Sequence, residues 1–254
     1  MSKVLFSLRR LCVLRNGFDT GTGTYNVNNT SHDGDKIVAI DGPAGAGKST
    51  VSRRVAAMLG FAFLDTGAMY RAATWRALKH GVALDDAEAV TASTRAMRLE
   101  LAERNAGLRV YADGEDVTDA IRSPEVTRNI FRLDQVPGVR RRLVELQREF
   151  GCRRPTVAEG RDIGTVVFPN ARCKIYLDAS LECRARRRAL EMEERGVPVD
   201  FPALIEEIRE RDEKTMNRAD SPLRRAADAV LVDTTDMNLE QVVDTLTSLA
   251  RERL

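Results

Sequence analysis

The chain has 254 residues, of which 43% are apolar and 31% are charged. This mixture is typical of a folded domain and excludes wholesale disorder. No stretch approaches the roughly 20 apolar residues of a membrane-spanning helix, so the sequence excludes an integral membrane protein of that kind. The net charge is +2, with 34 Arg against 6 Lys. This balance disfavours a large DNA footprint, but it leaves room for local anion sites because a guanidinium binds phosphate through two bonds.

The first 35 residues differ in composition from the rest of the chain. Residues 1–18 carry four basic side chains and no acid, and residues 17–34 are rich in Gly, Asn, Thr and Ser. Few apolar and many turn-forming residues predict a disordered N-terminal extension over residues 1–35. The basic stretch is open to two interpretations, a dispensable extension or an organelle transit peptide.

From residue 36 onward, short apolar runs alternate with helical patterns. Strands are predicted at residues 37–40, 61–64, 156–158, 173–177 and 229–232. Helices are predicted from the end of the first loop to about residue 59, and at residues 68–79, 181–194, 201–211 and 239–254. This alternation, with continuously apolar strands, predicts an α/β domain over residues 36–254, built on a parallel sheet with helices on both faces.

One segment interrupts the alternation. Residues 108–117 have the pattern of a hairpin that turns at Asp113 and Gly114, and helical patterns follow, the last over residues 136–150. We therefore predict an insert in the α/β core at about residues 93–150.

A phosphate-binding loop is the strongest motif. The GxxxxGK[ST] pattern is formed by Gly42, Pro43, Ala44, Gly45, Ala46, Gly47, Lys48 and Ser49. It lies between a predicted strand and a predicted helix, which is the context that the mechanism needs. Backbone N–H groups and the start of the helix would hold the phosphates, Lys48 would reach the β- and γ-phosphates, and the Ser49 hydroxyl would ligate Mg²⁺. The chain is predicted to bind a nucleoside triphosphate.

Two polar segments follow predicted strands at the sheet edge where ligands collect in such folds. Thr66 and Arg71 come after the second strand, and Glu159, Arg161 and Asp162 come after the third. Glu159, at the end of its strand, is placed to hold Mg²⁺ through water. The alternative for each segment is a solvated loop with an ion pair.

Arginines crowd one predicted helix and the loop and helix beyond it. The cluster consists of Arg184, Arg186, Arg187, Arg188, Arg209, Arg211 and Arg218. Like charges at this spacing repel each other unless an anion or nearby acids compensate them. The pattern predicts a mobile arginine lid at about residues 187–213, which would close over the triphosphate. The alternative is a solvated face paired with the neighbouring glutamates.

Taken together, these motifs resemble bacterial cytidylate kinase. The resemblance rests on the phosphate loop, LDTGAMYR, GEDVTDAIR, EGRDIGTVVFP and the stretch from RERD to NRADSPL, and it covers residues 36–254. It implies Mg²⁺-dependent transfer of the γ-phosphoryl group of ATP to CMP or dCMP. It also implies a P-loop core, a nucleoside-monophosphate-binding insert and a short Arg-rich lid.

The resemblance also assigns roles to residues. It implies that residues 42–50, from Gly42 to Thr50, bind ATP. Independently of the resemblance, the arginine cluster predicts that Arg184 and Arg187 also bind ATP, and the loop and strand-end positions predict that Ser49 and Glu159 hold the metal. Lys48, Arg161, Asp162 and Arg188 would be catalytic. The monophosphate would contact Thr66, Tyr70, Arg71, Arg140, Arg161, Asp162, Arg211 and Arg218.

Two positions depart from the family pattern. Phe131 stands where a small hydroxyl residue usually helps to read the cytosine, and Thr215 stands where an acid usually contacts the sugar. Losing a charge-assisted bond to a sugar hydroxyl costs roughly 1.5–3 kcal/mol if nothing replaces it. Phosphoryl transfer to another acceptor, such as UMP, and a nucleotide-binding paralogue with weakened transfer are the alternatives.

Composition and the resemblance also give expectations about surroundings. The four cysteines show no metal-binding or CxxC spacing, which favours a reducing compartment and a cytoplasmic protein, with organelle import as the alternative. Aromatic residues make up only 5% of the chain and form no basic tract interleaved with aromatics, so we expect no nucleic-acid partner. We also expect no membrane partner and a monomer.

Overall fold

The computed structural model describes residues 11–13, 36–104, 107–194 and 196–254. The chain divides into two compact units. Unit 1 comprises residues 1–25 and 68–146, and unit 2 comprises residues 26–67 and 147–254. Each unit is described by itself below.

Unit 2 is built on a parallel sheet of five strands in the order β3-β7-β2-β8-β9. The strands are β2 (Ile37–Asp41), β3 (Ala62–Asp65), β7 (Thr156–Gly160), β8 (Cys173–Asp178) and β9 (Val230–Asp233). Every predicted strand is confirmed to within two residues at each end. All five residues of the central strand β2 are buried, as expected for a strand covered on both faces.

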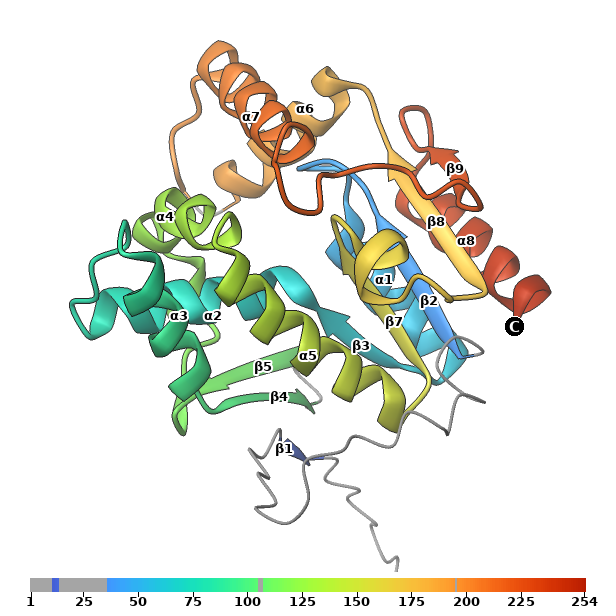
Figure 1. Cartoon of the computed structure of the whole chain (residues 1–254). Helices are drawn as coiled ribbons and strands as arrows, with labels where there is room; N and C mark the ends of the chain where they lie inside the picture. The colour runs from blue at the N-terminus through green and yellow to red at the C-terminus, as the bar shows by residue number, and fades with distance from the viewer. Residues whose placement is uncertain (1–10, 14–35, 105–106, 195) are drawn as a thin grey trace, which may run out of the picture. The chain divides into compact units, whose positions relative to one another are not determined.

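Helices cover both faces of this sheet, which confirms the predicted fold class. On one face, α1 (Lys48–Leu59) packs beside α8 (Leu239–Arg253). On the other, Gly151 near the end of α5 (Pro137–Arg153) approaches Phe168 and Ile37, next to the short π-helical turn η2 (Ile163–Val167). In Figure 1 the yellow turn η2 lies in front of the sheet and the blue helix α1 lies behind it.

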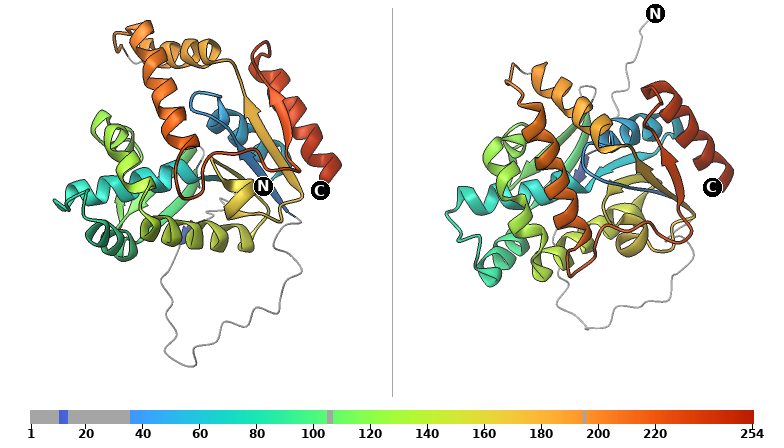
Figure 2. Two further views of the ribbon diagram at one scale, coloured as in Figure 1. Left: turned by 45° about the horizontal axis from the view of Figure 1, so that its top comes forward. Right: turned by 90° about the horizontal axis from the view of Figure 1, so that it is seen from above.

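The helices α6 (Leu181–Glu193) and α7 (Phe201–Met216) pack against each other within unit 2. Their contact is apolar: the small side chains of Ala185 and Ala189 on α6 pack against Leu204 and Ile208 of α7. Figure 2 shows the two helices side by side, joined by a short connection. Helix α7 continues five residues beyond its predicted end at residue 211, which brings Thr215 into the helix.

Unit 1 combines helices with an antiparallel sheet in the order β1-β4-β5-β6. Its elements are β1 (Leu11–Val13), α3 (Ala87–Ala96), β4 (Leu99–Arg104), β5 (Gly107–Ala112), β6 (Glu115–Asp116), η1 (Ala120–Arg122) and α4 (Pro124–Asp134), with most of α2 (Thr66–Lys79) and the first part of α5. The predicted hairpin is confirmed, because β5 and β6 pair around Asp113 and Gly114, both at positive φ. The sequence analysis did not predict α3 or β4.

The N-terminal extension was expected to be disordered over residues 1–35. Within it the structure describes β1, which pairs antiparallel with β4 so that Cys12 lies opposite Leu101. Leu11–Val13 therefore form a strand along the outer edge of β4, whose backbone groups are open to pairing there. The rest of this expectation lies outside the described residues.

In the described ranges, no helix combines the length and apolarity required to cross a membrane.

Candidate active site

The phosphate loop joins β2 to α1, as predicted. Its first glycine, Gly42, has φ 154°, and a Cβ placed there would lie 2.0 Å from the carbonyl oxygen of Leu177 in β8. Its last glycine, Gly47, adopts the left-handed conformation at the N-cap of α1, with φ 83°. Glycine at these two positions lets the loop press against the sheet and turn directly into the helix.

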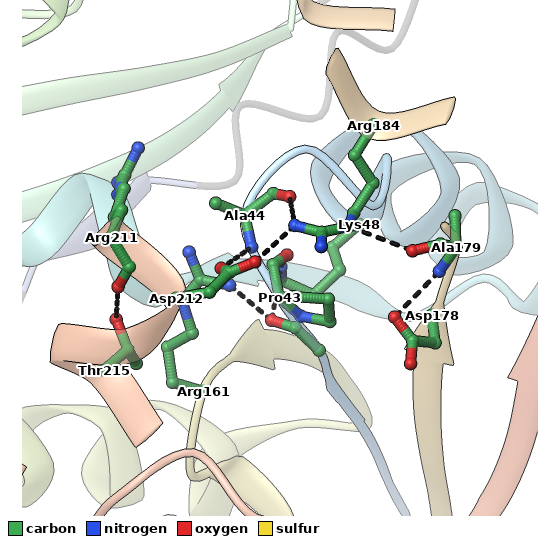
Figure 3. A network of polar contacts seen from close by, with 11 residues as sticks. Pro43, Ala44, Lys48, Arg161, Asp178, Ala179, Arg184, Arg211, Asp212 and Thr215 are labelled. Carbon is green, nitrogen blue, oxygen red and sulfur yellow. Dashed lines mark hydrogen bonds and ion pairs between the residues drawn. The ribbon is translucent and has the colours of Figure 1, made fainter. Parts of the chain in front are cut away.

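Two cations meet on one carbonyl of this loop. Lys48 is buried, and its Nζ donates to the carbonyl oxygens of Gly42 at 2.8 Å and Pro43 at 2.6 Å. The Arg161 guanidinium donates to the same Gly42 oxygen, and Figure 3 shows both side chains beside the loop. Burial, and then the charge of Arg161, lower the pKa of Lys48. An anion in the loop would relieve this repulsion, so the electrostatics favour a phosphate ligand.

A hydroxyl and a carboxylate lie together beside the loop. The Ser49 hydroxyl donates to Glu159, which is buried at the carboxyl end of β7. Burial, and then the nearby Asp65 carboxylate, raise the pKa of Glu159 to about 7. In the described ranges no three His, Cys, Asp or Glu side chains form a metal cage. The hydroxyl and the carboxylate are oxygen donors that fit Mg²⁺, which usually takes one or two protein ligands and keeps several waters.

Arg184, predicted to bind ATP, is tied to the loop and to α7 instead of standing free on the lid. Its Nε donates to the Ala179 carbonyl at 3.0 Å, and its Nη1 donates to the Ala44 carbonyl at 2.9 Å and to the Asp212 carboxylate. Asp212 in turn accepts from the Ala44 backbone N–H at 3.0 Å. Figure 3 shows this closed network. The sequence analysis missed Asp212, which is one of several acids in an acid-rich helix.

The other two predicted lid arginines have different surroundings. Arg187 donates to the Thr234 hydroxyl at 3.0 Å, to the Thr234 carbonyl at 2.7 Å and to the loop carbonyl of Ala46 at 3.4 Å. Arg188 instead pairs with Glu191 at 3.0 Å, and both side chains are well exposed. Of the three arginines, Arg188 therefore matches the alternative interpretation, in which the arginines form a solvated face and pair with neighbouring glutamates.

Five predicted acceptor residues lie in unit 2, and one of them, Arg161, is described above. The buried Thr66 donates its hydroxyl to the Glu159 carbonyl at 2.7 Å, and Asp162 is buried two residues beyond Gly160. Arg211 lies on α7, and Arg218 follows that helix, where its guanidinium donates to the Asp220 and Ser221 carbonyls. Asp162 and Thr66 therefore flank the same turn at the end of β7.

Three further predicted acceptor residues come together in unit 1. The Arg140 guanidinium lies over the Tyr70 ring, 5.9 Å from its centre, and Arg140 is buried. Arg71 donates to the Thr127 hydroxyl of α4 at 2.9 Å. The expectation that Arg71 and Arg140 share one anion with Arg161 stays a prediction, because Arg161 belongs to unit 2.

Comparison with known proteins identifies the family. The model of the cytidylate kinase family matches residues 38–252. The chain belongs to the cytidylate kinase family. The cytidylate kinase of Desulfitobacterium hafniense is 47% identical over 217 residues, which are 85% of this chain and 93% of that protein. The cytidylate kinase of Shouchella clausii is 47% identical over 215 residues, 85% of this chain and 96% of that one.

Longer members of the family also match. The bifunctional pantoate ligase/cytidylate kinase of Synechococcus sp. strain JA-2-3B'a(2-13) is 48% identical over 221 residues. Those residues are 86% of this chain and 41% of that protein, so the chain spans about two-fifths of the length of this bifunctional relative.

The two departures from the cytidylate kinase pattern have distinct surroundings. Phe131 is 43% exposed on α4, one turn beyond Thr127. Thr127 is a hydroxyl residue that the sequence analysis missed, although its spacing of four residues from Phe131 on a predicted helix places both on one face. Thr215 donates its hydroxyl to the Arg211 carbonyl at 2.8 Å, as hydroxyl residues inside helices often do.

Proposed function

We propose that the protein transfers the γ-phosphoryl group of ATP to CMP or dCMP, giving ADP and CDP or dCDP. The observation that carries the proposal is the meeting of Lys48 and Arg161 on the Gly42 carbonyl, within the phosphate loop of a cytidylate kinase family member. Two cations that share one neutral acceptor are poised to exchange it for phosphate oxygens.

The loop supplies the donor side of the reaction. Backbone N–H groups of the loop and the N-terminus of α1 bind phosphate oxygens, and Lys48 moves from the Gly42 and Pro43 carbonyls to the transferring group. Phosphoryl transfer needs positioning and charge stabilisation more than covalent chemistry from the protein. A buried lysine acts strongly here, because low surrounding polarity strengthens its attraction to developing charge.

The proposed metal is Mg²⁺. Ser49 would hold it through its hydroxyl, and Glu159 through water. When bound, Mg²⁺ would supply positive charge that offsets the charge developing on the transferring phosphoryl group. The chain's own part is to keep these two oxygen donors next to each other at the end of β7.

The acceptor side is proposed from residues of each unit. Arg71, Arg140 and Tyr70 of unit 1 would bind the monophosphate, as would Arg161, Thr66, Arg211 and Arg218 of unit 2. Asp162 would accept from the cytosine 4-amino group, which favours cytosine over uracil because a keto oxygen has no proton to give. The adjacency of Arg140 to Tyr70 and of Arg71 to Thr127 supports a cationic surface in unit 1.

A second candidate is a kinase with an altered acceptor, favoured by the exposed Phe131 in place of a hydroxyl. A coupled ADP-release assay across CMP, dCMP, UMP, AMP and GMP separates the two. We expect CMP or dCMP to exceed UMP in kcat/KM by at least about tenfold, as expected for a lost or mismatched hydrogen bond. Equal rates with UMP would show that the acceptor specificity has changed.

The remaining sequence predictions concern surroundings. We propose a cytoplasmic monomer that works without nucleic acid or a membrane, with organelle import as the alternative location. The cysteines whose side chains the structure describes, Cys152, Cys173 and Cys183, form no disulfide with one another. Light scattering and fractionation of cells test these two points.

A further inference from the structure

Asp41, the last residue of β2, holds a distant part of the chain. It directly precedes Gly42 and is 4% exposed. Its Oδ1 accepts from the backbone N–H of Ile163 at 2.7 Å, and its Oδ2 accepts from that of Gly164 at 2.8 Å. One carboxylate therefore uses both oxygens on the first two N–H groups of η2.

These bonds replace a local cap. The first N–H groups of a helical turn have no partner within the turn and need an acceptor from elsewhere. Asp162, the residue at the N-cap of η2, makes no side-chain capping bond. Asp41 supplies the acceptor from more than 120 residues earlier in the chain. Aspartate usually caps the helix that follows it directly in the chain. In this protein Asp41 caps η2 from the neighbouring strand of the sheet.

The turn that Asp41 holds carries Arg161 and Asp162. Asp41 lies opposite Gly160 in the β2–β7 pairing, and Arg161 follows immediately and donates to Gly42. The packing is tight, because a Cβ on Gly160 would lie 2.7 Å from both the Thr66 hydroxyl and Ile163. The same residue thus anchors the start of the phosphate loop through its backbone and the Arg161–Asp162 turn through its side chain.

We propose that Asp41 is a positioning residue for phosphoryl transfer. It sets Arg161 and Asp162 against the phosphate loop, and it acts on the acceptor through these two side chains without touching the substrates itself. The inference rests on the proposed acceptor role of Arg161 and Asp162. It adds a residue that the phosphate-loop motif does not include, and it explains why an aspartate ends this buried strand.

The substitution Asp41→Asn tests the proposal. Asparagine keeps one acceptor oxygen and turns an NH₂ group toward a backbone N–H, so one of the two bonds is lost. We expect kcat to fall and the KM for CMP to rise, each by about tenfold, since small misplacements at a reacting site have effects up to 10²-fold. The Kd for ATP, measured by titration without acceptor, should stay within about twofold, because the loop itself is intact. A residue with only a structural role would lower the melting temperature without this split.

Gly164→Ala provides a second perturbation without a change of charge. The new methyl group would lie 3.3 Å from Asp41 Oδ2 and 3.2 Å from the Lys174 side chain, so it presses on the carboxylate. We again expect kcat to fall and the KM for CMP to rise while the Kd for ATP stays unchanged, with smaller effects than in Asp41→Asn. Asp233→Asn is the matched control, because Asp233 also ends a parallel strand of this sheet. Among the residues that the structure describes, its carboxylate accepts only from the backbone N–H and the hydroxyl of Thr235, two residues further on.

Amide hydrogen exchange provides a readout that does not depend on the acceptor. In Asp41→Asn the N–H groups of Ile163 and Gly164 should exchange faster, and in Asp233→Asn they should not.

The outcomes separate the two proposals. A wild-type enzyme that phosphorylates another acceptor would overturn the proposed function, and the kcat and KM of the variants are then measured with that acceptor. Asp41→Asn and Gly164→Ala proteins with wild-type acceptor KM and kcat would overturn the positioning role. If Asp41→Asn does not fold, Gly164→Ala decides alone.

Discussion

Arg184 and Asp212 form a buried ion pair that joins α6 to α7 and holds the phosphate loop between them. Each side chain is about nine-tenths buried, and both also bond to Ala44, one to its carbonyl and the other to its N–H. The pair therefore links the two helices of the predicted lid to the loop that they would close over. Movement of α7 relative to the loop would have to break these bonds.

Removing one partner of this pair should cost stability. We expect Arg184→Ala to lower the free energy of unfolding by about 3–5 kcal/mol, because it leaves the Asp212 charge buried and uncompensated. Arg188→Ala, which removes an exposed pair with Glu191, should cost less than about 1 kcal/mol. Urea unfolding of both variants measures the difference. Equal losses would show that the Arg184 pair is solvated in solution.

Arg188 also tests the predicted lid. If it turns to the phosphates during closure, Arg188→Ala should lower kcat more than it raises the KM for ATP, because it would act mainly in the transition state. Steady-state kinetics on this variant and on Arg187→Ala show whether these arginines act on the transferring phosphoryl group or keep their contacts within the protein. Wild-type kcat in both would leave Arg188 with its Glu191 pair and no catalytic role.

Lys48→Ala should lose turnover while the fold survives. We expect kcat to fall by about 10²–10³-fold, as when one preorganised donor is removed from a transition state. The melting temperature should not fall, since a buried lysine with a lowered pKa is itself costly to bury. ADP release and thermal unfolding measure the two effects. A variant within threefold of the wild-type rate would refute the assignment of Lys48.

Phe131→Ser tests the departure in unit 1. A hydroxyl restored at this position on α4 should improve kcat/KM for CMP by about tenfold and leave UMP unchanged, if it contacts the cytosine. Phe131 is 43% exposed, so the substitution should change stability little. Phe131→Ala is the control, because it removes the ring without adding a hydroxyl. An equal gain with alanine would indicate relief of a steric block instead.

The pH dependence of Asp41 gives a prediction with opposite signs for activity and stability. Burial is the main cause that raises its pKa from 3.8 to about 6; the charge of Asp162 adds to this, whereas the bonds from Gly164 and Ile163 and the charge of Lys48 lower it. The folded state thus binds this proton more tightly than the unfolded state, so the contribution of Asp41 to stability rises as the pH falls from about 6 to 4.

Activity should move the other way. A protonated Asp41 loses an acceptor oxygen for η2, so kcat should fall below about pH 6, and Asp41→Asn should not show this acid limb. Rate profiles and urea unfolding of wild type and Asp41→Asn from pH 5 to 8 measure both trends, with Asp233→Asn as control. An unchanged acid limb in Asp41→Asn would assign the limb to another group.

Truncation of residues 1–34 tests the strand β1. Turnover should not change, because none of the proposed site residues lies in this segment. Amide exchange at residues 100–102 should increase, because the pairing of β1 with β4 is lost. Unchanged exchange would show that this pairing does not persist in solution.

The sequence by itself determined the elements whose signals are local. The phosphate loop, the apolar run of β2 and the Asp113–Gly114 turn each follow from residues that are neighbours in the chain, where glycine conformation and strand burial are fixed by short-range sterics and hydrophobicity. The family resemblance also rested on such local motifs.

Only the tertiary structure decided which charged side chains act together. Arg184, Arg187 and Arg188 have the same chemistry in the sequence, yet one is buried against Asp212, one holds Thr234 and one is exposed beside Glu191. Asp41 reads in the sequence as an ordinary strand end, and its bonds to Ile163 and Gly164 exist only because β2 and β7 pair in register. Hydrogen bonds and ion pairs depend on distances of a few ångströms. The partners can lie far apart in the chain, 28 residues for Arg184 and Asp212 and 122 for Asp41 and Ile163, and the tertiary packing sets those distances.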